Sequence, residues 1–333
     1  MIRLRNLYLL TRNETLKVLR KKRFLVVLLI LAVLIPLFAY GQYTQQERVK
    51  AQSGVTDWRA ELGQEIVETE RRLASPTMQD DRRKTLEMRL EQNKYYLERN
   101  INPSEPGATS FTRIFMQFGI SLFLPLLVVV VATDIVSSEL QDGTIKLLLT
   151  RPVKRWKILL SKFLTLMIFT TLTVVVMGVI SFLVSGLFFG YAGWDAPMFT
   201  GFTIVNGTFD TSAVQMIPHW HLLLMNYGLG WIAAIAVATL SFMVSVLVRG
   251  TATGMGVMLA LLIGGSIMGQ MASDFPLTKY VFTTHLRLTD YINGVPVAVE
   301  GLTLNYSLAA LAIWSAAALA LSFLSFTKRD VLA

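Results

Sequence analysis

The chain of 333 residues contains no cysteine. This absence excludes disulfide bonds, thiol catalysis and cysteine-ligated metal sites, and it leaves the redox compartment open. Charged residues are also scarce, because they make up 16% of the chain, whereas about 25% is usual in soluble domains. With 53% hydrophobic residues, the chain has too few charges to coat a soluble globule. The composition therefore predicts an all-α polytopic membrane protein.

Two further absences limit the chemistry of the chain. No Gly-x-x-x-x-Gly-Lys-Ser/Thr motif occurs, so we do not expect the chain to hydrolyse ATP through a P-loop of its own. The apolar runs carry no ionisable residue deep inside them, which argues against a proton relay, an ion-coupled transporter or an intramembrane hydrolase. His219 and His221 could ligate a metal, but no further ligand lies near them in the sequence, so Trp220 is expected to act as an interfacial anchor instead.

The formal net charge of +9 comes from basic residues that flank the apolar runs. Such an excess is typical of the cytoplasmic side of membrane proteins. No basic face occurs outside those flanks, so nucleic acid is not an expected partner.

Residues 1–23 carry eight basic residues and a single acidic one, Glu14. Seven residues fall on one helical face, which predicts an amphipathic interfacial helix in the headgroup layer rather than a disordered tail. They are Leu4, Leu7, Tyr8, Thr11, Thr15, Val18 and Leu19. Residues 24–40 form the first predicted transmembrane span, because the basic stretch before them is too long for the n-region of a signal peptide.

Residues 41–110 change in character, with dense charge of both signs and few large apolar residues. Two apolar stripes at helical spacing are separated by Ser75-Pro76, which predicts a helical hairpin outside the bilayer. Its 11 basic and 12 acidic residues nearly cancel, so many salt bridges are expected on its surface. A spacer or packing domain is the expected role, and a substrate receptor remains the alternative.

Five further apolar runs follow within residues 111–333, and each is long enough to cross a hydrocarbon core of about 30 Å. They cover residues 114–133, 158–185, 229–248, 253–271 and 305–326. Lys162 lies near the start of the second of these runs and is expected to snorkel to the interface. The remaining loops are 190–221 and 272–304, and a short re-entrant or surface helix is expected in the second.

The side of the membrane follows from Lys and Arg in the short flanks, of which seventeen fall on one side and three on the other. Six spans place both termini on the basic side. We therefore expect a multi-pass protein of a cell membrane, namely a bacterial plasma membrane. Both termini are expected to be cytoplasmic, and the hairpin and both loops are expected to be external.

Residues 134–157 form a polar cytoplasmic segment between the second and third spans. A turn is predicted at Glu139, Asp142, Gly143 and Thr144, with Gly143 at positive φ. Helical spacing then predicts one short amphipathic helix, with its apolar face at Ile145, Leu148 and Leu149. Arg151-Pro152 ends this helix and can start the next, because proline suits the first helical position and not the interior. Basic residues at 154, 155 and 157 follow.

This segment resembles the cytoplasmic signature of type-2 ABC transporter permeases. In that family a glutamate, then Gly-Thr, a leucine run, Arg-Pro-Val and a lysine connect spans two and three. The matching residues here are Glu139, Gly143-Thr144, Leu147-Leu148-Leu149, Arg151-Pro152-Val153 and Lys162. The end of the chain, from Phe326 to Asp330, is similar to the Phe-x-x-Arg-Asp ending of many members. The resemblance covers the spans and the connecting segment, and nothing is carried over to residues 41–110.

The resemblance implies a permease subunit, expected to be an exporter, that works with ATP and magnesium held by separate subunits. Two cytoplasmic ATP-binding subunits and a second permease, either another copy or a homologue, would complete the transporter. The residues implied in coupling to the ATPase are Glu139, Gly143, Thr144, Leu148, Arg151, Pro152 and Arg155. Alternatively, Glu139 and Arg151 pair locally or snorkel. No catalytic, cofactor-binding or metal-binding residue is expected in the chain.

A different class of protein also fits the sequence. The chain could be a non-transporting membrane anchor or sensor whose external hairpin, residues 41–110, binds a partner.

Overall fold

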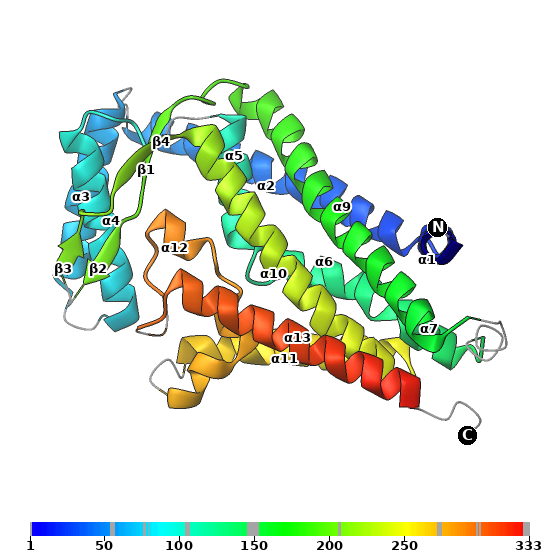
Figure 1. The fold of residues 1–333 in the computed structure, drawn as a ribbon. Helices are drawn as coiled ribbons and strands as arrows, with labels where there is room; N and C mark the ends of the chain where they lie inside the picture. Colours follow the sequence, from blue (N-terminus) through cyan, green and yellow to red (C-terminus); the bar gives the residue numbers. More distant parts are fainter. Residues whose placement is uncertain are drawn as a thin grey trace.

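The computed structural model describes residues 2–53, 57–75, 78, 80–103, 107–144, 153–205, 208–271, 275–297, 299 and 301–328. Six helical segments of this described part are long and apolar enough to cross a membrane, which confirms the predicted polytopic helical membrane protein. They are Arg23–Arg48, Phe123–Gln141, Arg155–Phe189, His219–Leu247, Thr251–Gly269 and Leu304–Lys328. Both termini lie at one end of the bundle, and the hairpin lies at the other end (Figure 1).

The bundle is arranged around α10 (His219–Leu247), which packs against α5 (Ala108–Gly119), α6 (Phe123–Ala132), α9 (Arg155–Phe189) and α13 (Leu304–Lys328). Small buried residues such as Ala233, Ala234 and Ala238 line α10. Their short side chains let neighbouring helices approach closely, which is how helices associate where no hydrophobic force drives them together. α10 is therefore well buried, whereas α11 (Thr251–Met271) and α13 expose most of their apolar surface.

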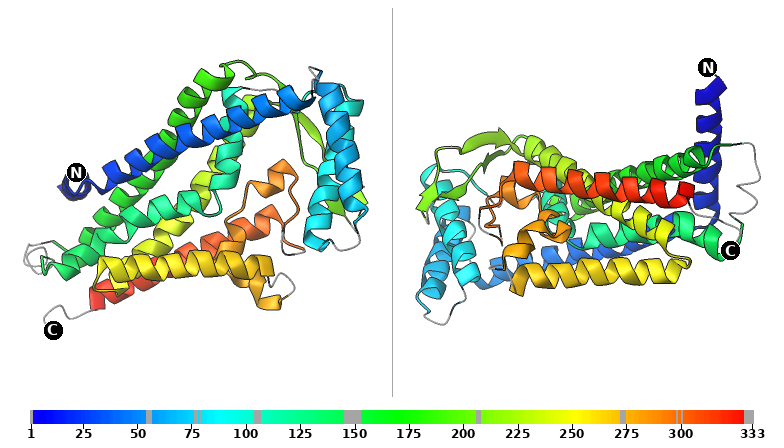
Figure 2. Two further views of the ribbon diagram at one scale, coloured as in Figure 1. Left: turned by 180° about the vertical axis from the view of Figure 1, so that it is seen from behind. Right: turned by 60° about the horizontal axis from the view of Figure 1, so that its bottom comes forward.

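The first helix, α1 (Ile2–Arg20), lies across the end of the bundle and runs in a different direction from α2 (Arg23–Ser53) (Figure 2). Lys22 makes the corner between them at φ 58°. On the predicted apolar face, Tyr8 is 66% exposed and Leu19 is 50% exposed, so these side chains do not pack inside the protein. The side of α1 that packs on α9 is centred on Glu14 instead.

Two predicted spans have different boundaries in the structure. α2 does not end at residue 40 but continues to Ser53, beyond the predicted start of the hairpin. The predicted span 114–133 is broken at residues 120–122, between α5 and α6. Pro125 explains the new helix start, since proline lacks an N–H and is tolerated in the first turn of a helix. After Thr133, the helical path continues as α7 (Asp134–Gln141).

The predicted hairpin is confirmed as α3 (Trp58–Leu73) and α4 (Asp80–Glu98). Ion pairs cross it at Arg89–Glu65 and Lys94–Glu70, with N–O distances of 2.6 and 3.0 Å. Its apolar core is completed by Phe199 and Phe202, which come from the loop predicted at 190–221.

That loop contains short strands that the sequence analysis did not predict. β1 (Pro197–Thr200) pairs antiparallel with β4 (Gln215–Pro218), and β2 (Thr203–Val205) pairs antiparallel with β3 (Thr208–Asp210). The fourth long helix, α10, then begins at His219, ten residues before the predicted span.

The loop predicted at 272–304 contains the expected short helices, which are η1 (Pro276–Tyr280), η2 (Phe282–His285) and α12 (Asp290–Asn293). η2 packs against α11 and α13. A Cβ atom on Gly265 of α11 would lie 2.3 Å from the hydroxyl oxygen of Thr283. The small residue at this position therefore serves packing within the chain.

Candidate coupling site

Charged side chains from α1, α7 and α9 meet inside the protein at the end that holds both termini. Glu14 comes from α1, Glu139 from α7 and Lys162 from α9, and all three are buried. Lys17, one turn after Glu14, completes a group that we call the charge quartet. More than 120 residues of sequence separate the quartet residues of α1 from Glu139 and Lys162, which are themselves 23 residues apart.

Each ammonium group of the quartet contacts both carboxylates. The Nζ atom of Lys162 lies 2.6 Å from Glu14 Oε2 and 2.8 Å from Glu139 Oε2. The Nζ atom of Lys17 lies 2.7 Å from Glu14 Oε1 and 2.9 Å from Glu139 Oε1. The four formal charges cancel. Two ion pairs must therefore break when any one of the three helices moves away from the others.

Lys162 does not snorkel to the interface, so that prediction is wrong. Its side chain is fully buried (0% exposed), and Nζ also donates to the carbonyl oxygen of Ile135 at 3.2 Å. The reason is α1, which covers this part of α9 and places Glu14 beside the ammonium group. A buried ammonium group is tolerated where carboxylates and a carbonyl satisfy it.

The environment of Lys17 favours its charged form. Partial burial alone would lower the pKa of Lys17, but the hydrogen bonds and charges of Glu14 and Glu139 outweigh burial and raise it above the ordinary value. Lys17 therefore keeps its positive charge throughout the physiological pH range.

A second group of polar contacts surrounds Asp134, the first residue of α7. Its carboxylate lies 2.9 Å from Arg23 Nη2 and 3.3 Å from Lys21 Nζ. Thr251 Oγ1, at the start of α11, donates to Asp134 Oδ1 at 3.2 Å. Lys21 Nζ also donates to Ser138 Oγ at 2.6 Å. These contacts connect the corner between α1 and α2 to α7 and α11.

The start of α7 is held by α10 through one hydroxyl group. Ser245 Oγ accepts hydrogen bonds from the backbone N–H groups of Val136 and Ser137 at 3.1 and 3.0 Å, and it donates to the carbonyl of Thr133 at 2.8 Å. The first N–H groups of a helix have no partner within the helix. Ser245 thus satisfies two of them from a neighbouring helix, although the N-cap residue Thr133 makes no side-chain cap bond.

Among the residues that the sequence predicts for coupling, Glu139 is placed differently from expectation. It lies in helix α7 and not in a turn, and its carboxylate faces the protein interior. Glu139 forms ion pairs within the chain, with Lys162 23 residues away and with Lys17 122 residues away. The turn begins at Asp142, after α7 has ended.

Gly143 has φ 68°, which confirms the predicted positive φ, and Thr144 is exposed beside it. Leu148, Arg151 and Pro152 lie outside the described residues, and so does the predicted short amphipathic helix. Arg155 is the first residue of α9, where its Nη1 atom donates to the carbonyl oxygen of Thr327 in α13 at 3.4 Å.

Sequence reasoning missed the partners of Glu139, and it missed the buried position of the charges at this end of the spans. Two signals were present. A lysine inside an apolar run needs a counter-ion, and Glu14 is the lone acid in a strongly basic stretch. What the sequence lacks is any sign that α1 folds across α9, which is what brings these two residues together.

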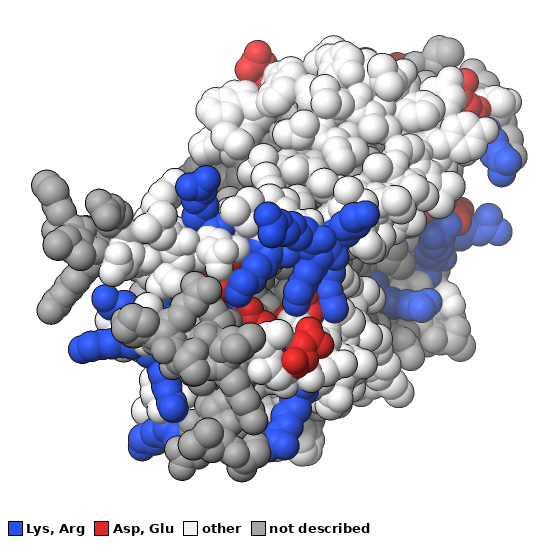
Figure 3. Space-filling model, turned by 90° about the vertical axis from the view of Figure 1, so that its right-hand side faces the viewer, with Lys and Arg blue, Asp and Glu red and all other residues white. Residues whose placement is uncertain are grey.

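The surface around the quartet is basic. Figure 3 shows the end of the molecule that holds both termini, where Lys and Arg side chains gather around a few acidic ones. Exposed Arg12, Arg20 and Lys22 belong to this end, together with Lys154 before α9. A partner that binds here meets positive charge at the rim, because the carboxylates of Glu14 and Glu139 are buried beneath it.

The histidine pair shows no metal geometry. His219 is buried and its Nε2 accepts a hydrogen bond from Arg113 Nε at 3.2 Å, whereas Trp220 is 40% exposed. Among the described residues, no group of three or more His, Cys, Asp or Glu side chains could hold a metal ion.

Comparison with known proteins gives a family and two relatives. Residues 82–332 match the family described as "Protein of unknown function (DUF2705)". "Uncharacterized protein YhcI" of Bacillus subtilis (strain 168) is 30% identical over 276 residues, which cover 82% of this chain and 84% of the relative. "Uncharacterized membrane protein YdbK" of the same bacterium is 27% identical over 214 residues, which cover 64% of this chain and 79% of the relative. The chain belongs to the DUF2705 family.

Proposed function

We propose that the chain is the permease subunit of an ATP-binding cassette exporter, driven by ATP that a separate subunit hydrolyses. The observation that carries the proposal is the position of the charge quartet. It lies directly before the segment that resembles the ATPase-contacting signature, and it connects α7, which leads into that segment, with α1 and α9. A displacement of α7 therefore acts on two other helices at once.

A rigid-body movement needs elements that move as units. The quartet cross-links three helices at the end with the termini, and Ser245 and Thr251 add α10 and α11. A push on the chain at residues 145–152 would reach α7 through the turn at Gly143. ATP binding can shift this end of the bundle only if the partner contacts its two states differently, and the basic rim offers it a surface for such contacts.

The proposed orientation places both termini and the basic rim in the cytoplasm. Seventeen of the Lys and Arg residues in the short flanks fall on this side and three on the other, and the structure puts both termini at one end. The proposed location is the bacterial plasma membrane, with the hairpin outside the cell. Both relatives come from a bacterium, and the printed name of one includes the word membrane.

The proposed complex contains this chain, a second permease (either another copy or a homologue) and two ATP-binding subunits that hold ATP and magnesium. The lack of a P-loop in this chain supports a separate ATPase. The lipid bilayer surrounds the exposed apolar faces of α2, α9, α11 and α13.

The test starts from the affinity-tagged chain purified from membranes of its own host, with associated P-loop proteins identified by mass spectrometry. The chain and such a protein are then reconstituted in proteoliposomes, and ATP hydrolysis is compared with and without the chain. The proposal predicts that the chain stimulates hydrolysis and that Glu139→Gln weakens this stimulation. The absence of any associated P-loop protein, together with unchanged hydrolysis, would contradict the proposal.

The anchor or sensor alternative predicts the opposite response to loss of the hairpin. Replacing residues 57–103 by a flexible linker removes α3 and α4 but leaves the quartet intact. A permease should retain stimulated ATP hydrolysis after this change, whereas an anchor that works through its hairpin should lose all binding to its partner. Pull-down and hydrolysis measured on the same preparation separate the two functions.

A further inference from the structure

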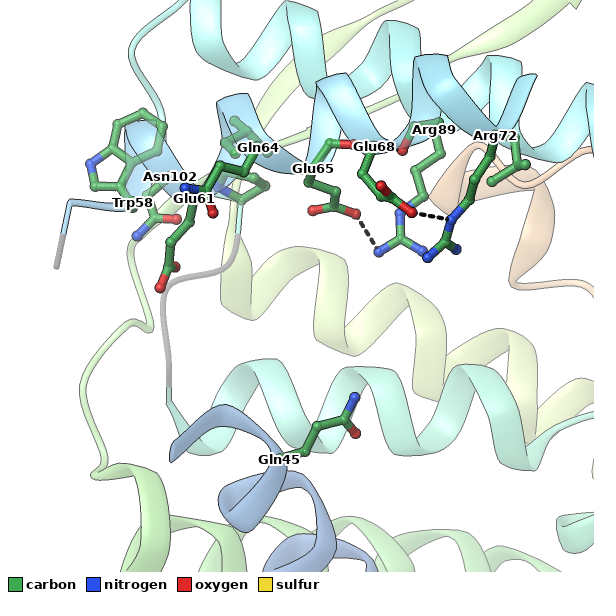
Figure 4. A pocket seen from close by; sticks show the side chains of 13 residues that line it. Gln45, Trp58, Glu61, Gln64, Glu65, Glu68, Arg72, Arg89 and Asn102 are labelled. Carbon is green, nitrogen blue, oxygen red and sulfur yellow. Dashed lines mark hydrogen bonds and ion pairs between the residues drawn. The ribbon is translucent and has the colours of Figure 1, made fainter. Parts of the chain in front are cut away.

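A cavity of about 590 Å³ lies at the hairpin end of the molecule, between the last turns of α2 and the helices of the hairpin. Figure 4 shows a row of side chains along α3, from Trp58 to Arg72, with Gln45 of α2 on the opposite side. Small-molecule sites typically have volumes of about 300–1,000 Å³ and mostly apolar walls with a few polar groups. The cavity has this size and this mixed character, since Leu62, Leu86 and Pro103 also line it.

Three glutamates but only two arginines line the cavity. Arg89 pairs with Glu65 at 2.6 Å, and Arg72 pairs with Glu68 at 3.0 Å. Glu61 is partly buried and, within the described part of the chain, makes no hydrogen bond or ion pair. Figure 4 shows Glu61 pointing away from α3, next to Trp58 and Asn102. One negative charge of the lining is therefore unmatched.

The nearest basic residue in sequence does not neutralise Glu61. Arg59 contacts Asp57 Oδ1 at 3.3 Å and donates to Asn100 Oδ1 at 2.8 Å, and its guanidinium group stacks on Trp58 at 4.7 Å. Glu61 also lies in the first turn of α3, where the helix dipole favours a negative charge. Among the described residues, no basic side chain pairs with Glu61, and its carboxylate is open to a cation from outside the chain.

We propose that this cavity binds an organic cation, with Glu61 as the counter-ion of its ammonium or guanidinium group. The apolar body of the ligand packs on Trp58, Leu62 and Leu86, and the amide groups of Gln45, Gln64 and Asn102 accept or donate further hydrogen bonds. An anion is disfavoured, because both arginines of the lining already have carboxylate partners. The inference goes beyond the proposed transport function and is independent of any ATPase.

The test measures binding to the full-length chain in nanodiscs of neutral phosphatidylcholine by isothermal titration calorimetry. One probe is acetyl-Leu-Lys-Leu-amide, and its neutral counterpart carries Gln in place of Lys. Hexylamine and hexanol form a second pair, which distinguishes a free amine from a peptide side chain as the source of the cation. We expect at least one cationic probe to bind at least tenfold more tightly than its neutral counterpart, with affinity that falls as salt rises.

Glu61→Gln should weaken binding of the cationic probe at least tenfold, whereas Glu98→Gln should leave the affinity unchanged. Glu98 is an exposed carboxylate of the same hairpin and lies outside the cavity lining. Equal thermal unfolding curves show that both variants are folded. The proposal is overturned if neither cationic probe binds, if Glu61→Gln binds like the unchanged chain, or if the neutral probe binds as tightly as the cationic one.

Discussion

Replacing Lys162 by methionine removes the ammonium group that lies between Glu14 and Glu139, and the methionine side chain fills much of the same space. The quartet then has two buried carboxylates and a single ammonium group, that of Lys17. Removing one partner of a buried ion pair typically costs about 3–5 kcal/mol, because an uncompensated charge remains in the interior. Lys162 is fully buried, so the upper part of this range applies.

A second substitution separates the lost charge from the lost packing. In the double variant Lys162→Met with Glu139→Gln, Lys17 and Glu14 remain as one neutral pair at 2.7 Å. Replacing a buried ion pair by groups of similar volume is often neutral. The double variant should therefore recover most of the stability that the single variant loses.

Thermal unfolding of the detergent-purified chain, followed by the loss of the monodisperse peak in size-exclusion chromatography, measures both effects. At about 2 °C per kcal/mol for a chain of this size, Lys162→Met should lower the apparent Tm by roughly 8–10 °C. Lys154→Met, at an exposed lysine before α9, is the matched control and should change it by less than about 1 °C. A Lys162→Met variant that unfolds within about 2 °C of the unchanged chain, or a double variant no more stable than the single one, would refute the reasoning.

Three other predictions concern distant parts of the fold. Burial raises the pKa of Asp290 to about 6, although the charge of Arg287 opposes this shift. The folded state therefore binds a proton at Asp290 more tightly than the unfolded state does. The free energy of unfolding should fall by up to about 3 kcal/mol as the pH rises from 4 to 6. Asp290→Asn should remove this slope from a plot of apparent Tm against pH. Gly143 has positive φ in an exposed turn, so Gly143→Pro should abolish stimulated ATP hydrolysis with little effect on Tm, while Gly143→Asn, which tolerates this conformation, should retain it. Gly265→Ala should lower the free energy of unfolding by about 1–3 kcal/mol, because the added methyl group overpacks against Thr283. Gly264→Ala is the control and should be neutral, because a Cβ atom there meets nothing within 4 Å. Equal Tm values for these two variants would contradict the packing role of Gly265.

Much of the fold could be predicted because its signals are local. An apolar run of sufficient length and a basic flank are each visible in a short window, and these predicted the six spans and the amphipathic helix α1. The hairpin was predicted from two apolar stripes at helical spacing, which Ser75-Pro76 separates. The break at residues 120–122 was missed because residues 114–133 are apolar almost throughout, so that hydropathy shows no helix end there; Pro125 was the signal available.

The site was harder to predict because its contacts are remote in sequence. The coupling role of Glu139 stays a prediction, and its helix was wrongly assigned to a turn because α7 carries more polar side chains than the spans do. The pairing of Glu14 with Lys162 depends on the angle at which α1 crosses α9, and that angle follows from the corner at Lys22. No pattern within the first 23 residues encodes this angle.

The position of Glu14 has a consequence for biosynthesis. Glu14 leaves the ribosome 148 residues before Lys162, and 125 residues before Glu139. Until α7 and α9 have been inserted, α1 has neither Glu139 nor Lys162 to hold it across the bundle, and after insertion Lys162 has only Glu139 as a counter-ion until Glu14 of α1 docks. Closure of the quartet therefore requires that α1 has docked on the second and third spans, and a nascent chain cut before residue 134 should leave α1 accessible to membrane-bound proteases.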